Sequence, residues 1–381
     1  MKTGGFLRAI IGISLAVLLT GCSFYDIPDG QIPDPYEGVV TSRFHTDEEM
    51  RDRMAKDVSK NQGEPLTIGL SQIGSESDWR IASTASVQAA FSSENGYNLI
   101  FDDAQQKQEN QLKALREFID QNVDYIILDP CVETGWDSVL KEARDAGIPV
   151  IVYDRRVAVE DEGLYSVWIG SDFNLEGERA CKYLDEFLKL KHVKSNINIV
   201  DIQGTIGATA QIGRSAALEK AVMLNKNWFL LERISGDFTE AKGGEVMEDM
   251  LESFGDTINV VYCENDNMAL GAIEKLKSKG YRVGSDIDKG EIAVLSFDAT
   301  RRGLEHTLNG DIVVNTECSP LYGPVLTHIV QALKNGEEPE HDIYIDEEQF
   351  ATESAIGMIH IGNDSYEVKN LTQEIIDGRI Y

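Results

Sequence analysis

The residues best suited to chemistry lie in a polar loop at positions 69–80, GLSQIGSESDWR, where Trp79 and Arg80 stand close to Glu76. A Trp ring offers an apolar face, while a carboxylate and a guanidinium offer fixed hydrogen-bond acceptors and donors. The loop follows an apolar run that begins at Leu66 and precedes a helical pattern, so we predict a strand-to-helix turn. In open α/β sheets, ligands bind outside the carboxyl ends of the strands. We therefore interpret the loop as one wall of a binding site.

The chain around this loop alternates short apolar runs with amphipathic helical patterns. Residues 125–128, for example, form an apolar run, and residues 136–146 follow with a helical pattern. This alternation predicts an α/β protein with parallel sheets that carry helices on both faces, although a single eight-stranded barrel uses the same units. The length of 381 residues favours two lobes of about 150 residues each. Two such lobes would bring their strand ends together in one cleft.

The residues at the predicted strand ends are suited to hold a sugar, which has apolar C–H faces and a rim of hydroxyl groups. Trp79 and Phe238 are the candidate platforms for the apolar faces, one from each lobe. Carboxylates, amides and the Arg fork match hydroxyl groups that both donate and accept. The candidate rim residues are Glu76, Arg80, Asp154, Arg155, Arg214, Asn265, Asp298 and Glu317.

Structural roles remain open for several of these residues. Trp79 could pack at the start of the helix that follows it, and Phe238 could belong to the core. Asn265 stands where it could cap the next helix. Arg214 lies within a helical pattern, where a solvated surface residue is the alternative.

The sequence carries no signature of a catalytic or metal site. The motifs G-x-G-x-x-G, G-x-x-x-x-G-K, G-x-S-x-G and H-E-x-x-H are absent, and the six His residues show no ligand spacing. The cysteines after Cys22 form no C-x-x-C pair, so we expect buried free thiols at Cys131, Cys181, Cys263 and Cys318. Disulfides are the alternative, because export permits them, and the sequence does not rank their three possible pairings. We predict a protein that is not an enzyme and uses no metal and no cofactor. A secreted sugar-processing enzyme is the weaker alternative.

Residues 1–21 have the features of an export signal. Lys2 and Arg8 form a basic start, and an apolar segment at 9–19 is too short to span a bilayer comfortably. The string LTGC that ends at Cys22 is typical of a bacterial lipoprotein signal, in which the Cys becomes the lipidated N-terminus; a plain signal peptide or a short anchor helix is the alternative. We expect an exported protein that is anchored by lipid to the outer face of a bacterial membrane.

Acidic residues dominate both residues 22–65 and the whole chain. Residues 22–65 also contain several prolines, so we expect an acidic tether outside the folded body, with a short helix as an option at 46–59. The chain has 35 basic and 65 acidic side chains, a net charge of −30. Such a charge repels phosphate backbones, so nucleic-acid binding is not expected.

Several long strings in both halves resemble one known family. The first half contains IGLSQIGSESDWR at 68–80, QQKQENQ at 105–111, TGW at 134–136 and IPVIVYDR ending at Arg155. The second half contains QGTIGATAQIGR ending at Arg214, SGDFTEAKGGEVM from Ser235 and END at 264–266. The chain from about 66 to 345 thereby resembles the type I periplasmic sugar-binding proteins of ABC importers, the family of ribose-, galactose- and xylose-binding proteins. Within that family it resembles the galactofuranose-binding members most closely.

The resemblance implies two doubly wound parallel-sheet lobes joined by a hinge of three crossings, near Ser171, Glu317 and Asp346. The N-terminal lobe would contain residues 66–169 and 318–345, and the C-terminal lobe residues 170–317 and 346–381. The sugar-binding residues would be Glu76, Trp79, Arg80, Asp154 and Arg155 on the first lobe, and Arg214, Phe238, Asn265, Asp298 and Glu317 on the second lobe or hinge. Asp78 departs from the family pattern, because a small residue is expected at its position.

The resemblance also implies a function. A monomeric, lipid-anchored receptor would close about a monosaccharide, galactofuranose or another pentose or hexose, and pass it to the permease subunits of an ABC importer. A membrane kinase or chemoreceptor, to which the closed receptor would report the sugar, is the alternative partner.

Overall fold

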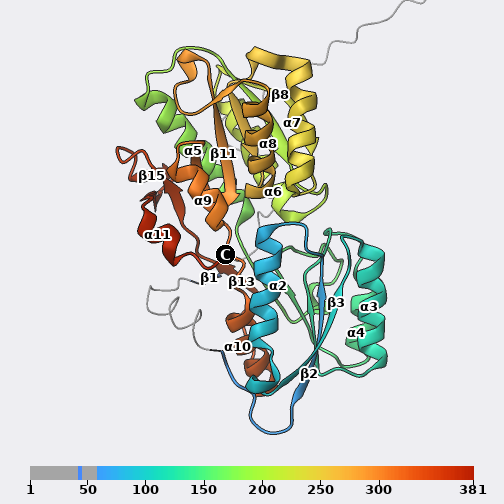
Figure 1. The fold of residues 1–381 in the computed structure, drawn as a ribbon. Helices are drawn as coiled ribbons and strands as arrows, with labels where there is room; N and C mark the ends of the chain where they lie inside the picture. Colours follow the sequence, from blue (N-terminus) through green and yellow to red (C-terminus); the bar gives the residue numbers. More distant parts are fainter. Residues whose placement is uncertain (1–41, 45–57) are drawn as a thin grey trace, which may run out of the picture. The chain divides into compact units, whose positions relative to one another are not determined.

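The computed structural model describes residues 58–381 and the backbone of residues 42–44. The predicted signal at 1–21, the lipidated Cys22 and nearly all of the predicted helix at 46–59 lie outside these residues. Two sheets organise the described chain (Figure 1). None of the helices in the described part combines the length and the apolar character that a membrane crossing requires.

The first sheet has seven strands, and all of its pairings are parallel. In spatial order the strands are β1 (Ser42–Phe44), β13 (Asp342–Ile345), β6 (Val167–Gly170), β5 (Val150–Tyr153), β4 (Tyr125–Leu128), β2 (Leu66–Gln72) and β3 (Tyr97–Asp103). Helices α2 (Asp78–Ala90) and α10 (Gly323–Lys334) lie together on one face, and α3 (Gln108–Asp120) and α4 (Asp137–Asp145) on the other (Figure 1). Burial of both faces explains why β4 is a continuous apolar run: Ile127 packs toward α2 and α10, whereas Ile126 and Leu128 pack toward α3 and α4.

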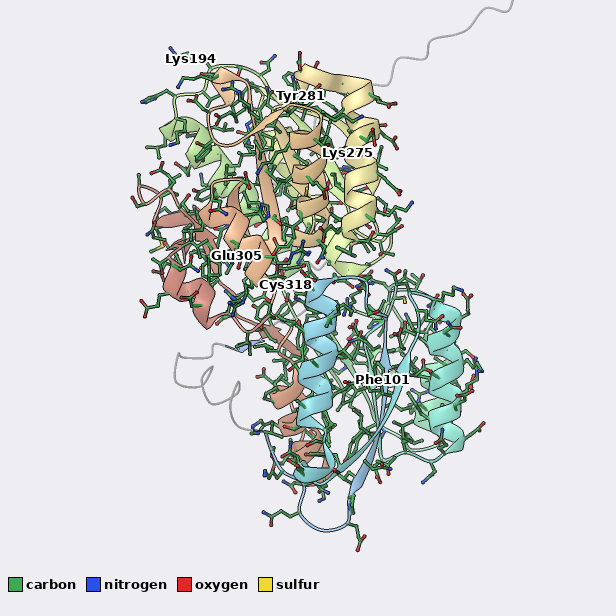
Figure 2. All side chains as sticks on the ribbon, viewed as in Figure 1. Phe101, Lys194, Lys275, Tyr281, Glu305 and Cys318 are labelled. Carbon is green, nitrogen blue, oxygen red and sulfur yellow. The ribbon has the colours of Figure 1, made fainter. Side chains whose placement is uncertain are left out.

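The second sheet has eight strands and is parallel except at one edge. In spatial order the strands are β17 (Lys369–Asn370), β14 (Gln349–Ala351), β12 (Ile312–Glu317), β11 (Glu291–Asp298), β9 (Val260–Cys263), β7 (Ile197–Gln203) and β8 (Trp228–Ser235), with β10 (Arg282–Val283) beside β11. Only β14 runs antiparallel to its neighbour β12 among the described strands of this sheet. Helices α5 (Phe173–Leu190) and α6 (Thr209–Leu224) cover one face, and α7 (Glu240–Phe254) and α8 (Asp266–Ser278) the other. Side chains fill the space between each sheet and its helices (Figure 2).

Shorter elements complete the fold. These are α9 (Arg301–Leu308), the hairpin β15 (Met358–Ile361) and β16 (Asp364–Glu367), α11 (Gln373–Gly378), and the 3-10 turns η1 (Ser93–Asn95), η2 (Glu162–Leu164), η3 (Gly255–Thr257) and η4 (Ile287–Lys289).

The chain passes between the two sheets at three places: after β6, after β12 and between β13 and β14. The prediction of two doubly wound parallel sheets is therefore confirmed, and the single barrel is excluded. The four cysteines in the described chain are buried free thiols, as expected.

The prediction that residues 22–65 stay outside the fold is wrong for part of this segment. The backbone at 42–44 extends the first sheet beside β13. Further along, Ser59 accepts a hydrogen bond from the Tyr97 hydroxyl (2.6 Å), and the Asn61 amide donates to the Asn95 carbonyl (2.9 Å). The apolar-period pattern could not reveal these links, because backbone groups and polar side chains make them.

Candidate binding site

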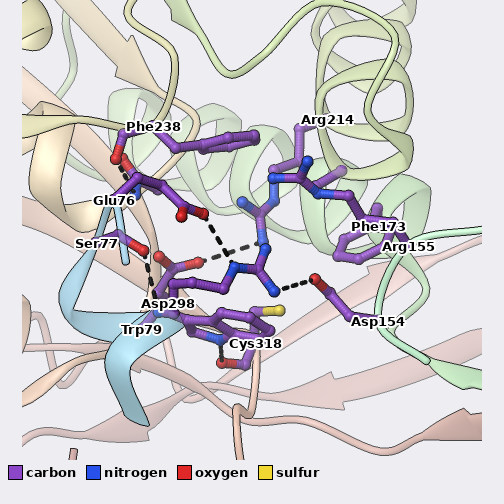
Figure 3. A pocket seen from close by; sticks show the side chains of 13 residues that line it. Glu76, Ser77, Trp79, Asp154, Arg155, Phe173, Arg214, Phe238, Asp298 and Cys318 are labelled. Carbon is purple, nitrogen blue, oxygen red and sulfur yellow. Dashed lines mark hydrogen bonds and ion pairs between the residues drawn. The ribbon is translucent and has the colours of Figure 1, made fainter. Parts of the chain in front are cut away.

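The carboxyl ends of strands from both sheets meet around a cavity of about 30 Å³ (Figure 3). This volume is about that of one or two water molecules, so a larger ligand requires the walls to move apart. The cavity is lined by Glu76, Ser77, Trp79, Arg80, Asp154, Arg155, Phe173, Ala210, Arg214, Phe238, Asn265, Asp298 and Cys318.

Arg80 holds together the acidic wall on the first sheet. Its guanidinium contacts three carboxylates: Glu76 at 2.9 Å, Asp154 at 3.0 Å and Asp129. Ser77 caps α2 by accepting a hydrogen bond from the Arg80 amide at 3.1 Å, which fixes the start of the helix that carries Arg80. Burial raises the pKa of the Asp129 carboxyl well above its usual value, although Arg80 opposes the shift. The wall thus offers several fixed acceptors around one cation.

The Trp79 ring lines the same wall and is anchored to the second crossing between the sheets. Its indole Nε1 donates to the carbonyl of Cys318 at 2.6 Å, and its ring lies edge-on to Tyr322 at 6.3 Å. Trp79 therefore has both roles considered above: it is fixed by packing at the start of α2, and it lines the cavity. The hydrogen bond leaves the ring little freedom to turn.

Arg155 reaches from the end of β5 toward the second sheet. Its Nη1 donates to the carbonyl of Cys131 at 2.7 Å, and its guanidinium carbon lies 5.2 Å from the centre of the Phe238 ring. A guanidinium at this distance from an aromatic face makes a cation–π contact. The two predicted walls thus touch through these residues.

Arg214 holds together the opposite wall, on the second sheet. It is 2% exposed, which excludes the solvated surface position considered above. Its Nε donates to Glu176 at 2.7 Å, its Nη2 lies 3.5 Å from Asp298, and its Nη1 contacts the carbonyl of Glu264. Burial raises the pKa of the Asp298 carboxyl well above its usual value, while Arg214 acts in the opposite direction.

The Phe238 ring lies directly on Gly204, which follows β7. A Cβ at position 204 would meet the ring at 1.9 Å, so only glycine leaves space for it. Asn265 supports the same loop, because its Nδ2 donates to the Phe238 carbonyl at 3.2 Å while its Oδ1 caps α8 at the amide of Met268 (2.9 Å). Asn265 is thus both a helix cap and a support of the cavity.

The backbone is left-handed at three of the lining residues. The φ angles are +59° at Asp154, +59° at Phe238 and +96° at Asp298. Non-glycine residues rarely adopt such angles, and the strain costs of order 1–3 kcal/mol at each position. Each sharp turn directs a side chain from a strand end into the cavity.

All of the predicted site residues line the cavity except Glu317. Glu317 Oε1 contacts Arg379 and accepts from the Tyr381 hydroxyl at 2.7 Å, while its Oε2 accepts from the Glu348 amide at 2.9 Å. Its carboxylate thus ties the end of β12 to the last residues of the chain.

The sequence reasoning missed the lining residues Ser77, Phe173, Ala210 and Cys318. Phe173 begins α5 directly after a crossing, so it is an aromatic residue at a helix start, like Trp79. That shared position could have identified it. Ala210 and Cys318 carry no such signal.

Contacts between the two walls also account for Asp78, which the family pattern left unexplained. Its carboxylate lies 3.2 Å from Arg302 of α9, which also pairs with Glu240 at 2.8 Å. Its backbone amide donates to Asn267 at 3.0 Å. Asp78 thus joins the helix beside Trp79 to the second sheet at the cavity rim.

Comparison with known proteins places the chain among solute receptors. The model of the periplasmic binding protein domain family matches residues 68–338. The chain is 39% identical over 279 residues to the galactofuranose-binding protein YtfQ of Escherichia coli (strain K12), covering 72% of this chain and 85% of that protein.

Two solved structures extend the comparison. A Mycobacterium smegmatis protein in complex with β-D-fucofuranose is 38% identical with a TM-score of 0.71, and the match covers 75% of this chain and 91% of that one. The periplasmic binding component of the arabinose ABC transporter from Shewanella sp. ANA-3, bound to α- and β-L-arabinofuranose, is 38% identical with a TM-score of 0.70, covering 76% and 93%.

Proposed function

Because the chain belongs to the periplasmic binding protein domain family, we propose that its cavity captures a monosaccharide in the five-membered-ring, or furanose, form. The ligands named for the two solved relatives support the choice of a furanose. Galactofuranose is the first candidate, since the 39% identical relative is a galactofuranose-binding protein.

The observation that carries the proposal is the pairing of aromatic rings with unpaired polar groups in one cavity. Trp79 and Phe238 come from different sheets and suit the two apolar faces of a sugar ring. No described residue donates to the buried Glu76 Oε2. A buried acceptor without a donor costs about 1–3 kcal/mol, and a sugar hydroxyl would supply the missing hydrogen bond.

Closure of two lobes about the hinge would follow from contacts to both walls. A ligand favours a closed state only when it gains contacts there that the open state lacks. We propose residues 66–169 with 318–345 as one lobe and residues 170–317 with 346–381 as the other. A sugar held by Arg80 and Arg155 on one side and by Arg214 and Asp298 on the other would draw them together.

We further propose that the protein is exported, held by lipid at Cys22 and used to deliver the sugar to an ABC importer. The string LTGC and the transporter named for the Shewanella relative support this part of the proposal. Co-purification of permease subunits with the membrane-anchored protein tests it, whereas recovery of a membrane kinase or chemoreceptor would favour a sensory role.

A matched pair of ring-locked sugars tests the furanose proposal. 1,4-Anhydrogalactitol keeps the five-membered ring of galactofuranose, and 1,5-anhydrogalactitol keeps the six-membered ring of galactopyranose. We expect calorimetry to give at least tenfold tighter binding of the five-membered ring, a difference of about 1.4 kcal/mol.

Tighter binding of 1,5-anhydrogalactitol would contradict the furanose proposal but would still support a sugar receptor. If neither compound binds, nor D-galactose, D-fucose or L-arabinose, the proposal of a sugar receptor fails. Glu76→Gln is the accompanying variant, because an amide replaces the unpaired carboxylate acceptor without changing the side-chain length.

A further inference from the structure

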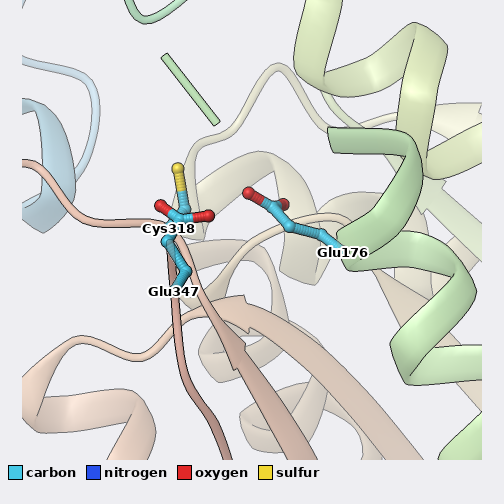
Figure 4. Close-up of side chains that lie close together, drawn as sticks. All are labelled: Glu176, Cys318 and Glu347. Atoms are coloured by element: carbon cyan, nitrogen blue, oxygen red, sulfur yellow. The ribbon is translucent and has the colours of Figure 1, made fainter. Parts of the chain in front are cut away.

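We propose that Glu176, Cys318 and Glu347 form a binding site for one divalent zinc-type cation behind the sugar cavity. One carboxylate oxygen of each Glu and the Cys318 Sγ lie within 4.8 Å of one another. Figure 4 shows the Glu176 carboxylate facing the Cys318 and Glu347 side chains, which lie close together. They come from α5, from the second crossing and from the third crossing, so the site lies where the chain passes between the sheets.

An unpaired buried oxygen points to a ligand at this centre. Glu176 is 2% exposed, and its Oε2 accepts from Arg214, while its Oε1 has no donor among the described residues other than a protonated form of the facing Glu347. The facing Glu347 accepts hydrogen bonds at Oε1 from the Ser171 hydroxyl (2.7 Å) and the Ser319 amide (2.6 Å). Two buried carboxylates cannot stay charged side by side unless a proton or a cation lies between them.

The three donors suit zinc better than calcium or magnesium. Zinc accepts thiolate and carboxylate ligands together, whereas the hard cations prefer oxygen ligands alone. In a tetrahedral site the Zn–S and Zn–O bond lengths place the ligand atoms roughly 3.4–3.6 Å apart. The cluster therefore needs to contract by about 1.4 Å at most. A water molecule would complete the coordination.

The surroundings would hold the ligands in place and admit the ion. The hydrogen bonds from Arg214 to Glu176 and from Ser171 to Glu347 fix the outer oxygens, as outer-shell partners do in metal sites. A second cavity of about 60 Å³, lined in part by Glu176, Arg179 and Glu347, reaches the cluster. Cys318 also lines the sugar cavity, so the ion would sit between the two cavities.

Cobalt uptake by the purified wild-type protein provides the primary test, because cobalt replaces zinc and reports a bound thiolate by a charge-transfer absorption. The protein is stripped with a chelator and titrated with Co²⁺ and then Zn²⁺. We expect one metal per chain and a thiolate-to-cobalt band that zinc displaces. The variants are Cys318→Ala, Glu347→Gln and, as a matched control, Cys181→Ala, which removes a buried thiol outside the cluster.

We expect Cys318→Ala to abolish the band, Glu347→Gln to weaken zinc binding at least tenfold, and Cys181→Ala to retain wild-type binding. The proposal is overturned if stripped wild-type protein takes up no stoichiometric metal, which would leave a shared proton between the two Glu residues. It is also overturned if the band survives Cys318→Ala. The wild-type titration decides the first point even if a variant fails to fold.

Discussion

Substitution of Gly204 by Ala tests whether the Phe238 ring forms a wall of the binding site. The added Cβ would lie 1.9 Å from the Cζ of Phe238 and 2.3 Å from each Cε, whereas carbon atoms pack at about 3.5–4.0 Å. The ring must therefore move by roughly 1.5 Å or more. Overpacking of this kind costs about 1–3 kcal/mol, so we expect sugar affinity to fall roughly 5- to 150-fold.

Calorimetry with the better-binding anhydrogalactitol measures this loss. Gly357→Ala is the control, because its Cβ meets no atom within 4 Å and its backbone is not left-handed. The reasoning also requires that Gly204→Ala has little further effect when Phe238 is already Ala, since the clash is then gone. Wild-type affinity in Gly204→Ala, or an equal loss in the Phe238→Ala background, would refute it.

Three further predictions follow from contacts described above. Asp78→Ala removes the exposed ion pair with Arg302, so we expect stopped-flow measurements to show that the sugar dissociates up to about fivefold faster. The difference from wild type should be smaller at high salt, because salt screens exposed charges. Equal dissociation rates at low salt would contradict this prediction. Burial raises the pKa of Glu264 to about 7, so the folded state holds a proton that the unfolded state has lost above pH 4.5. The free energy of unfolding should therefore fall by up to about 3 kcal/mol as the pH rises from 4.5 to 7. Denaturant titrations of Glu264→Gln should show a smaller fall over the same pH range. If the variant and the wild type lose the same free energy of unfolding over this range, Glu264 is not the group responsible. Phe350 is fully buried in β14. We therefore expect Phe350→Ala to lower the free energy of unfolding by about 3–5 kcal/mol. A change below about 1 kcal/mol would mean that residues 346–381 add little to the stability of the second sheet.

The sequence predicted the parallel sheets well because their strands are buried on both faces and read as short apolar runs. It could not predict the edge strands β1 and β17, which are three and two residues long and show no apolar period. Their partners, β13 and β14, lie elsewhere in the chain. Such pairing depends on backbone hydrogen bonds between distant segments, and side-chain patterns do not report it.

The candidate site was predicted where a strand end and a chemically distinctive side chain coincide, as at Arg80 and Asp298. Glu317 satisfies the same rule, yet its carboxylate turns to Arg379 and Tyr381, which only the folded C-terminal segment brings near. Cys318 was missed for the opposite reason, because its place is set by a crossing whose path the sequence pattern does not reveal.

The position of β13 and β14 has a consequence for the order in which the molecule folds. Residues 342–345 lie between β1 and β6 in the first sheet, and residues 349–351 and 369–370 add the last two strands to the second sheet beside β12. The first sheet therefore cannot finish assembling until the chain has been synthesised to about residue 345, and the second until about residue 370. Pairing of such distant segments slows folding. The two halves should acquire their final stability together, late and in one step, rather than one after the other as the ribosome releases them.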